Sequence, residues 1–216
     1  MTFKERLELC VYSSSLKNDT YDNVYAKNYN SVYSENDCIF EPKIIIVGTF
    51  TPIGGRANGF FYSSPKNKQM YFIDNELGKL KDELVNACVS DKKEKVDAIL
   101  KRLKKIEIMF LDTVYCNKSV NESRADDNYI DFDTLDDKSF ARYLKKEVRF
   151  ICNSRNAFYA LEKICEKSRS YPKDIVYVPQ INFHTSDTEK FRQWSYAINK
   201  NNNVFEGTVP KRVPRK

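Results

Sequence analysis

The chain has 216 residues, a length that suits one well-packed domain. A single histidine, and six cysteines without a CxxC pair, argue against a zinc site and against chemistry that needs several histidines. The net charge is +6, and no apolar run approaches the roughly 20 residues of a membrane span. The amino-terminal segment is charged and lacks a signal-peptide core. We therefore expect a cytoplasmic protein with no membrane partner and with reduced, mostly buried thiols.

Residues 1–42 are rich in Tyr, Asn and Ser and lack periodicity, which predicts a cap or arm over the core. Four short apolar runs follow, each typical of a strand that is buried on both faces. These runs cover residues 43–48, 106–112, 148–153 and 174–179.

Helical patterns separate these runs. They cover residues 75–89, 91–105, 139–148, 154–167 and 188–200. Asp91 and Glu94 form a candidate capping box, and Ser186 or Asp187 can cap the last helix. We expect Phe191, Trp194 and Ile198 to form the buried face of that last helix.

Strands that alternate with helices predict an α/β protein, a three-layer α/β/α domain with a central four-stranded parallel sheet. We assign this domain to residues 43–204, followed by a basic tail at 205–216.

Polar and aromatic residues follow the predicted strands, at the edge where parallel sheets bind ligands. The first strand leads through a Gly-rich loop into "FFYSSPKNKQMYF", residues 60–72. The other three strands end in, or lead to, carboxamides, a carboxylate and the histidine. The polar members of the set are Asn67, Asp112, Asn153, Gln180, Asn182 and His184.

Several kinds of chemistry lack their motif here. The Gly-rich loop has neither GxGxxG nor a P-loop lysine, and no nucleophile elbow is present. The acidic segment 125–137 could hold a cation but is more typical of a solvent-facing stretch, so we expect no metal. A pocket for a flat, hydrogen-bonding ligand remains, because an Asn side chain can read a base edge and rings can stack on it. The alternatives are an aromatic core for the loop and a helix cap for Asn153.

Five segments carry a family resemblance. They are "IIIVGTFTP" (44–52), "GFFYSSPKN" (59–67), "FLDTVYCNKSVNESRADDNYI" (110–130), "RFICNSRNAFYAL" (149–161) and "VYVPQINFHTSDTEKFRQW" (176–194). In this order the chain resembles the uracil-DNA glycosylase superfamily, most closely the branch with hypoxanthine-DNA and mismatch-specific glycosylases.

The resemblance implies a monomer that binds single- or double-stranded DNA and hydrolyses the N-glycosidic bond of a flipped uracil- or hypoxanthine-class base, without a metal or cofactor. It makes Asn67 the residue that positions water, Asp112 a second catalytic group and Asn153 the reader of the base. His184 would bond the base oxygen. It further implies base binding by Thr49, Phe50, Phe61 and Tyr62, and DNA contact by Arg56, Pro179, Gln180 and Asn182.

Two motifs depart from the family pattern. The Pro of the first motif comes one residue late, and the last motif lacks the Ser-Pro that follows its initial Pro. Three hypotheses therefore stand: a base-excision glycosylase, a relative that binds a modified base without cleaving it, and a hydrolase or transferase of free nucleosides or nucleotides. Basic residues at 101–105 and 211–216 are candidates for phosphate contact.

Overall fold

The computed structural model describes residues 30, 32–35, 39–50, 58–114, 135–178 and 186–199. Within these ranges, four parallel strands form one sheet in the order β2-β1-β3-β4. The strands are β1 (Ile44–Gly48), β2 (Ile108–Asp112), β3 (Arg149–Cys152) and β4 (Asp174–Tyr177). All four coincide with the predicted apolar runs, so the parallel sheet is confirmed.

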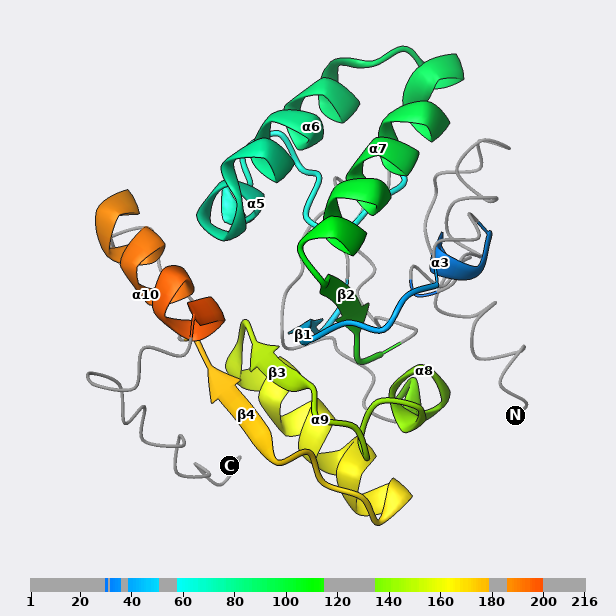
Figure 1. The fold of residues 1–216 in the computed structure, drawn as a ribbon, viewed down its shortest axis with the longest axis vertical. Helices are drawn as coiled ribbons and strands as arrows, with labels where there is room; N and C mark the ends of the chain where they lie inside the picture. The colour runs from blue at the N-terminus through cyan, green and yellow to red at the C-terminus, as the bar shows by residue number, and fades with distance from the viewer. Residues whose placement is uncertain are drawn as a thin grey trace, which may run out of the picture.

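Helices cover both faces of this sheet. Between β1 and β2 lie α5 (Gln69–Ile73), α6 (Asn75–Asn86), the short 3-10 helix η2 (Val89–Asp91) and α7 (Lys92–Lys105). The remaining helices are α3 (Val32–Glu35), α8 (Asp137–Ala141), α9 (Arg155–Ser168) and α10 (Asp187–Asn199). Figure 1 shows α6 and α7 on one side of the sheet and α9 on the other, which confirms the three-layer α/β/α architecture.

The strand order reverses direction at one point of the sheet. Strand β2 pairs with one edge of β1, and β3 pairs with the opposite edge of β1. The chain therefore first moves outward from β1 to β2 and then passes back across β1 to reach β3. In open parallel sheets, ligands bind beyond the carboxyl ends of the strands where the crossover direction reverses. That point lies here between the carboxyl ends of β1 and β3.

Local capping follows the sequence in part. Ser186 caps α10, since its Oγ accepts from the Glu189 amide at 3.2 Å, as predicted. The capping box at Asp91 is wrong: the Asp91 side chain makes no cap hydrogen bond and instead accepts from Ser90 Oγ at 2.7 Å. Helix η2 winds directly into α7, so Asp91 has helical backbone angles instead of the extended angles that suit a cap.

Two expectations about packing need correction. On α10, Trp194 is buried but Phe191 is 55% exposed, so Phe191 does not belong to the buried face of that helix. The helix predicted over 139–148 ends at Ala141 and gives way to turns before β3. Among the described cysteines, Cys152 and Cys165 are buried as expected, whereas Cys88 is exposed.

The outer edge of β2 is closed by two side chains from the amino-terminal part of the chain. The Tyr33 hydroxyl donates to the Phe110 carbonyl at 2.9 Å and accepts from the Phe110 amide at 2.7 Å. The Asn30 amide does the same for Asp112, with both distances 3.0 Å. Unpaired backbone groups of an edge strand can pair with another chain and so promote aggregation. The side chains of Tyr33 and Asn30 occupy these groups in place of a fifth strand.

No helix in the described part of the chain is long and apolar enough to cross a membrane.

Replacing Tyr33 with Phe should destabilise the fold. The substitution leaves the N–H and C=O of Phe110 buried without partners, and each such group costs about 1–3 kcal/mol. We expect urea unfolding to show a loss of roughly 2 kcal/mol or more. Tyr171→Phe, at an exposed tyrosine, is the matched control and should change the stability by less than about 0.5 kcal/mol. Equal effects of the two substitutions would refute the sealing role of Tyr33.

Candidate functional site

A cluster of polar side chains lies at the carboxyl ends of β1 and β3, the place where a ligand-binding crevice is expected. The side-chain Nδ2 of Asn153 donates to the Tyr62 hydroxyl oxygen at 2.7 Å. Gly48, the last residue of β1, lies against the same hydroxyl and against the carboxylate of Asp112. A methyl group on Gly48 would collide with both oxygens, so glycine is required for this close approach. Four residues that are distant in sequence therefore meet at one point.

Asn153 is presented by the end of β3 and not by a helix cap. Its backbone amide donates to the Val47 carbonyl at 3.1 Å, which extends the pairing between β1 and β3 by one step. The cap of α9 is the next residue, Ser154, whose Oγ accepts from the Ala157 amide at 3.0 Å. Because Ser154 serves the helix, the side chain of Asn153 is available to the crevice.

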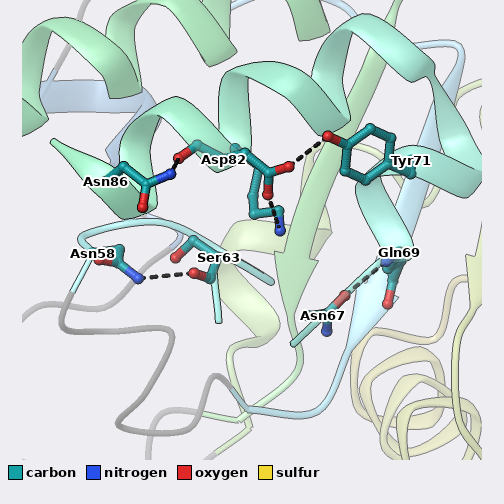
Figure 2. A network of polar contacts seen from close by, with 8 residues as sticks. Asn58, Ser63, Asn67, Gln69, Tyr71, Asp82 and Asn86 are labelled. Atoms are coloured by element: carbon teal, nitrogen blue, oxygen red, sulfur yellow. Dashed lines mark hydrogen bonds and ion pairs between the residues drawn. The ribbon is translucent and has the colours of Figure 1, made fainter. Parts of the chain in front are cut away.

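The loop that carries Tyr62 is anchored from within the protein. Phe60 and Phe61 are fully buried and pack with Phe110 at ring-centroid distances of 6.3 and 6.0 Å. Ser63 donates to the Phe60 carbonyl at 2.7 Å, and Asn58 donates to the Ser63 carbonyl at 2.8 Å (Figure 2). This rigid base positions the rest of the loop.

Tyr62 has a left-handed backbone conformation and a hydroxyl whose pKa is raised. Its φ angle is +51°, in the left-handed region that costs an L residue about 1–2 kcal/mol. Burial raises the pKa of the hydroxyl well above its usual value, and the Asp112 carboxylate raises it further. The hydrogen bond from Asn153 opposes these effects without cancelling them. At neutral pH Tyr62 is therefore a neutral group that cannot act as a base.

Asn67 lies at the start of α5, at the end of the same loop. Its Oδ1 accepts from the Gln69 backbone amide at 2.8 Å, as the dashed line in Figure 2 shows. The backbone amide of Asn67 donates to the Ser64 carbonyl at 2.9 Å. The neighbouring Lys68 reaches Asp187 on α10 at 2.8 Å and so ties the loop to that helix. These contacts fix the carboxamide of Asn67 in one orientation.

Asp112 brings a carboxylate to the carboxyl end of β2. It is 5% exposed, and its backbone N–H and C=O are held by Asn30, whose Nδ2 also reaches Asp136 Oδ2 at 2.5 Å. The adjacent Thr113 donates through Oγ1 to the Gly48 carbonyl at 3.0 Å. The carboxylate is thereby held beside the end of β1.

The structure brings together three of the predicted site residues, places a fourth on the same loop and encloses another in the core. Tyr62, Asn153 and Asp112 meet at Gly48, and Asn67 lies five residues beyond Tyr62 on the same anchored loop. The ring of Phe61 is enclosed in the core, which is the alternative that the sequence left open for this loop.

The other predicted site residues either follow β1 or lie outside the described part of the chain. Thr49 and Phe50 follow β1 and are half-buried, and the Thr49 carbonyl is already bonded to the Val114 amide at 3.1 Å. The remaining predicted residues lie outside the described ranges. These are Arg56, Pro179, Gln180, Asn182 and His184.

The sequence did not single out two residues that shape the site. In the sequence, Gly48 is one of several glycines at and after the end of the first strand. Only the structure shows that the Tyr62 hydroxyl and the Asp112 carboxylate occupy the space of a side chain at this position. Gln69 begins α5, and its side-chain amide lies near enough to the Tyr62 hydroxyl to lower the pKa of that group. The only sequence feature that could have indicated Gln69 is its position two residues after Asn67.

Two kinds of catalysis do not fit the described residues. Burial raises the pKa of the Cys152 and Cys165 thiols, Cys165 to about 11, so neither is a thiolate nucleophile at neutral pH. No group of three or more His, Cys, Asp or Glu side chains that could hold a metal ion occurs within the ranges given above. The cluster offers carboxamides, one hydroxyl and one carboxylate, which suit recognition of a neutral polar ligand and placement of water.

Comparison with protein-family models, curated proteins and solved structures found no match to this chain.

The roles of Asn153 and Ser154 can be separated by stability measurements. Ser154→Ala removes the cap of α9 and should cost about 1 kcal/mol in the free energy of unfolding. Asn153→Ala should cost less, because its side chain bonds a loop hydroxyl and not the helix. Urea titrations of the two adjacent variants provide the comparison. A larger loss for Asn153→Ala would assign that residue to the scaffold instead of the site.

Proposed function

We propose that the protein is a DNA glycosylase-like hydrolase that cleaves the N-glycosidic bond of a deaminated or damaged base, of the uracil or hypoxanthine class, flipped into the crevice between β1 and β3. The observation that supports this most strongly is the meeting of Asn153, Tyr62 and Asp112 at Gly48, at the switch point of the sheet. The order of motifs along the chain and the resemblance that they carry agree with this proposal.

The described groups suit the demands of the reaction. The bond between C1′ and the base nitrogen breaks, the oxygen of water bonds to C1′, and the base departs with a proton. The transition state carries positive charge on the sugar and negative charge on the base. Asn153 supplies donors to the base, and the Asp112 carboxylate supplies negative charge. Asn67 can orient water but cannot take its proton, because a carboxamide is not a base.

A non-cleaving reader of the same base is the second candidate, and one observation favours it. One of the two N–H donors of the Asn153 amide is already bonded to Tyr62, so that donor is satisfied without a ligand. A reader needs only to exchange this partner for a base, whereas a hydrolase must also place water.

Cleavage can be tested with oligonucleotides, single- and double-stranded, that contain uracil, hypoxanthine, xanthine or only unmodified bases. We expect abasic sites, detected by alkaline cleavage, with one of the modified bases. Asn67→Ala and Asn153→Ala should each lower the rate by about 100-fold or more, since each removes a group that touches water or base. Asn86→Ala, at an exposed asparagine of α6, is the matched control and should retain the wild-type rate.

The outcomes separate the three hypotheses. No abasic product, with saturable binding to one modified oligonucleotide, would replace the hydrolase by the reader. Cleavage of free nucleosides in preference to oligonucleotides would replace it by a nucleoside hydrolase. Full activity in both Asn67→Ala and Asn153→Ala would refute the site.

The charges around the crevice suggest which cations contact DNA. Lys66 precedes Asn67, and Arg155 follows Asn153 by two residues; both are exposed, and neither forms an ion pair with another described residue. The basic end of α7 lies elsewhere, because Lys105 comes just before the amino end of β2. Arg102 of that helix is occupied by Asp74, with an Nη2–Oδ2 distance of 2.7 Å. We therefore assign phosphate contact to Lys66 and Arg155.

Salt dependence of binding tests this assignment. Lys66→Gln and Arg155→Gln should each reduce the slope of log K against log salt by about 0.7–0.9, as expected for one lost phosphate contact. Lys104→Gln removes the same charge at the opposite edge of the sheet and should leave the slope unchanged. An equal change in all three variants would indicate a general effect of net charge and would contradict the assignment.

A further inference from the structure

Two side-chain amides lie near the Tyr62 hydroxyl at the candidate site, and one of them bonds it. Asn153 donates to the Tyr62 hydroxyl oxygen through Nδ2 at 2.7 Å. The Gln69 amide approaches the same oxygen and favours its ionised form, although burial has the larger, opposite effect on the Tyr62 pKa. The amides come from different layers of the fold, since Asn153 directly follows β3 and Gln69 begins α5.

One of these amides is unsatisfied. The Nε2 atom of Gln69 is buried and has no hydrogen bond of acceptable geometry to any described group. A buried donor without a partner costs about 1–3 kcal/mol and is rare in folded proteins, so the position of Nε2 calls for a partner that no described residue supplies. Its backbone amide, by contrast, is satisfied by Asn67 at 2.8 Å.

We propose that the Tyr62 hydroxyl oxygen occupies the place of an acceptor atom of the ligand, and that Gln69 and Asn153 together donate to that acceptor once Tyr62 has moved aside. Gln69 is then a specificity-determining residue and Tyr62 an internal competitor of the ligand. This inference rests on the proposed function in taking the ligand to be a base.

The polarity of the pair defines the ligand. Two N–H donors that point at one atom select a carbonyl oxygen, and they oppose an amino group at the same place because its hydrogens would face theirs. Hypoxanthine and adenine differ in this way at one position of the same ring system. Uracil likewise presents carbonyl oxygens. A deaminated base is thus distinguished from its parent by the atom that the two amides address.

The backbone of Tyr62 is consistent with its displacement. Its left-handed conformation, at φ +51°, stores strain of about 1–2 kcal/mol that a change of conformation releases. The residues before it are anchored in the core through Phe60 and Phe61, and those after it through Asn67. The movement therefore concerns Tyr62 and not the whole loop.

Binding of free bases to the full-length protein tests the proposal. Equilibrium dialysis with hypoxanthine, uracil and adenine gives the dissociation constants for wild type, Tyr62→Phe and Gln69→Leu. Tyr62→Phe removes the competing oxygen, so it should bind hypoxanthine or uracil about 3- to 10-fold more tightly, the equivalent of one net hydrogen bond. Gln69→Leu should bind the same base about 10-fold or more weakly. Adenine should bind weakly to all three proteins.

A stability measurement separates this role from a structural one. If Gln69 only braces Tyr62, Gln69→Leu should lower the free energy of unfolding. If Gln69 is an unsatisfied donor kept for a ligand, the leucine variant should be at least as stable as wild type, because an apolar group replaces an unpaired polar one. Urea unfolding of both variants decides this.

Weaker binding by Tyr62→Phe, unchanged binding by Gln69→Leu, or no binding of either carbonyl base to wild type and Tyr62→Phe would each overturn the inference. The cleavage assay on the same proteins keeps the proposed function separate. Tighter base binding by Tyr62→Phe without any abasic product would defeat the hydrolase and leave the pair of amides. Abasic product formed at equal rates by wild type and Gln69→Leu would support the hydrolase and refute the role of the two amides.

Discussion

The hydrogen bond from Asn153 to Tyr62 joins the two parts of the structure on which the site depends. Asn153 belongs to the sheet, at the carboxyl end of β3, and Tyr62 belongs to the loop that leads into α5. The bond can form only because Gly48 has no side chain, since a methyl group there would occupy the space of the Tyr62 and Asp112 oxygens. A glycine at the end of the central strand thus determines where loop, sheet and carboxylate meet.

The surroundings of this bond determine which chemical groups the candidate site offers. Burial keeps the Tyr62 hydroxyl and the Cys152 thiol protonated at neutral pH, so neither supplies a base or a nucleophile. Asp112 provides the carboxylate of the cluster, and its strand is closed by Asn30 and Tyr33 on the side away from β1. The rigidity of β2 therefore depends on side chains from a segment whose sequence shows no periodicity.

The sequence predicts the sheet well because each strand is a short apolar run with helical periodicity on either side. The parallel pairing places Asp112 and Asn153 at one edge without further information. Contacts between side chains are harder to predict. Phe61 and Tyr62 are adjacent aromatics that both pack against Phe110, but Phe61 is fully buried, whereas the hydroxyl of the partly buried Tyr62 accepts from Asn153. The hydrogen bonds between Tyr33 and the edge of β2, and the burial of Gln69 Nε2, likewise depend on tertiary packing.

The selectivity of the crevice follows from the cost of leaving donors unpaired. In a buried site, a ligand that satisfies an existing donor gains little beyond a net hydrogen bond, whereas a ligand that presents another donor leaves two groups unsatisfied at about 1–3 kcal/mol each. Rejection is therefore stronger than attraction. The hydroxyl of Tyr62 pairs with Asn153, whereas Gln69 Nε2 has no partner among the described residues. Under the proposal above, the Tyr62 hydroxyl stands in for a ligand acceptor at Asn153, and a carbonyl oxygen is the group that would pair with both amides.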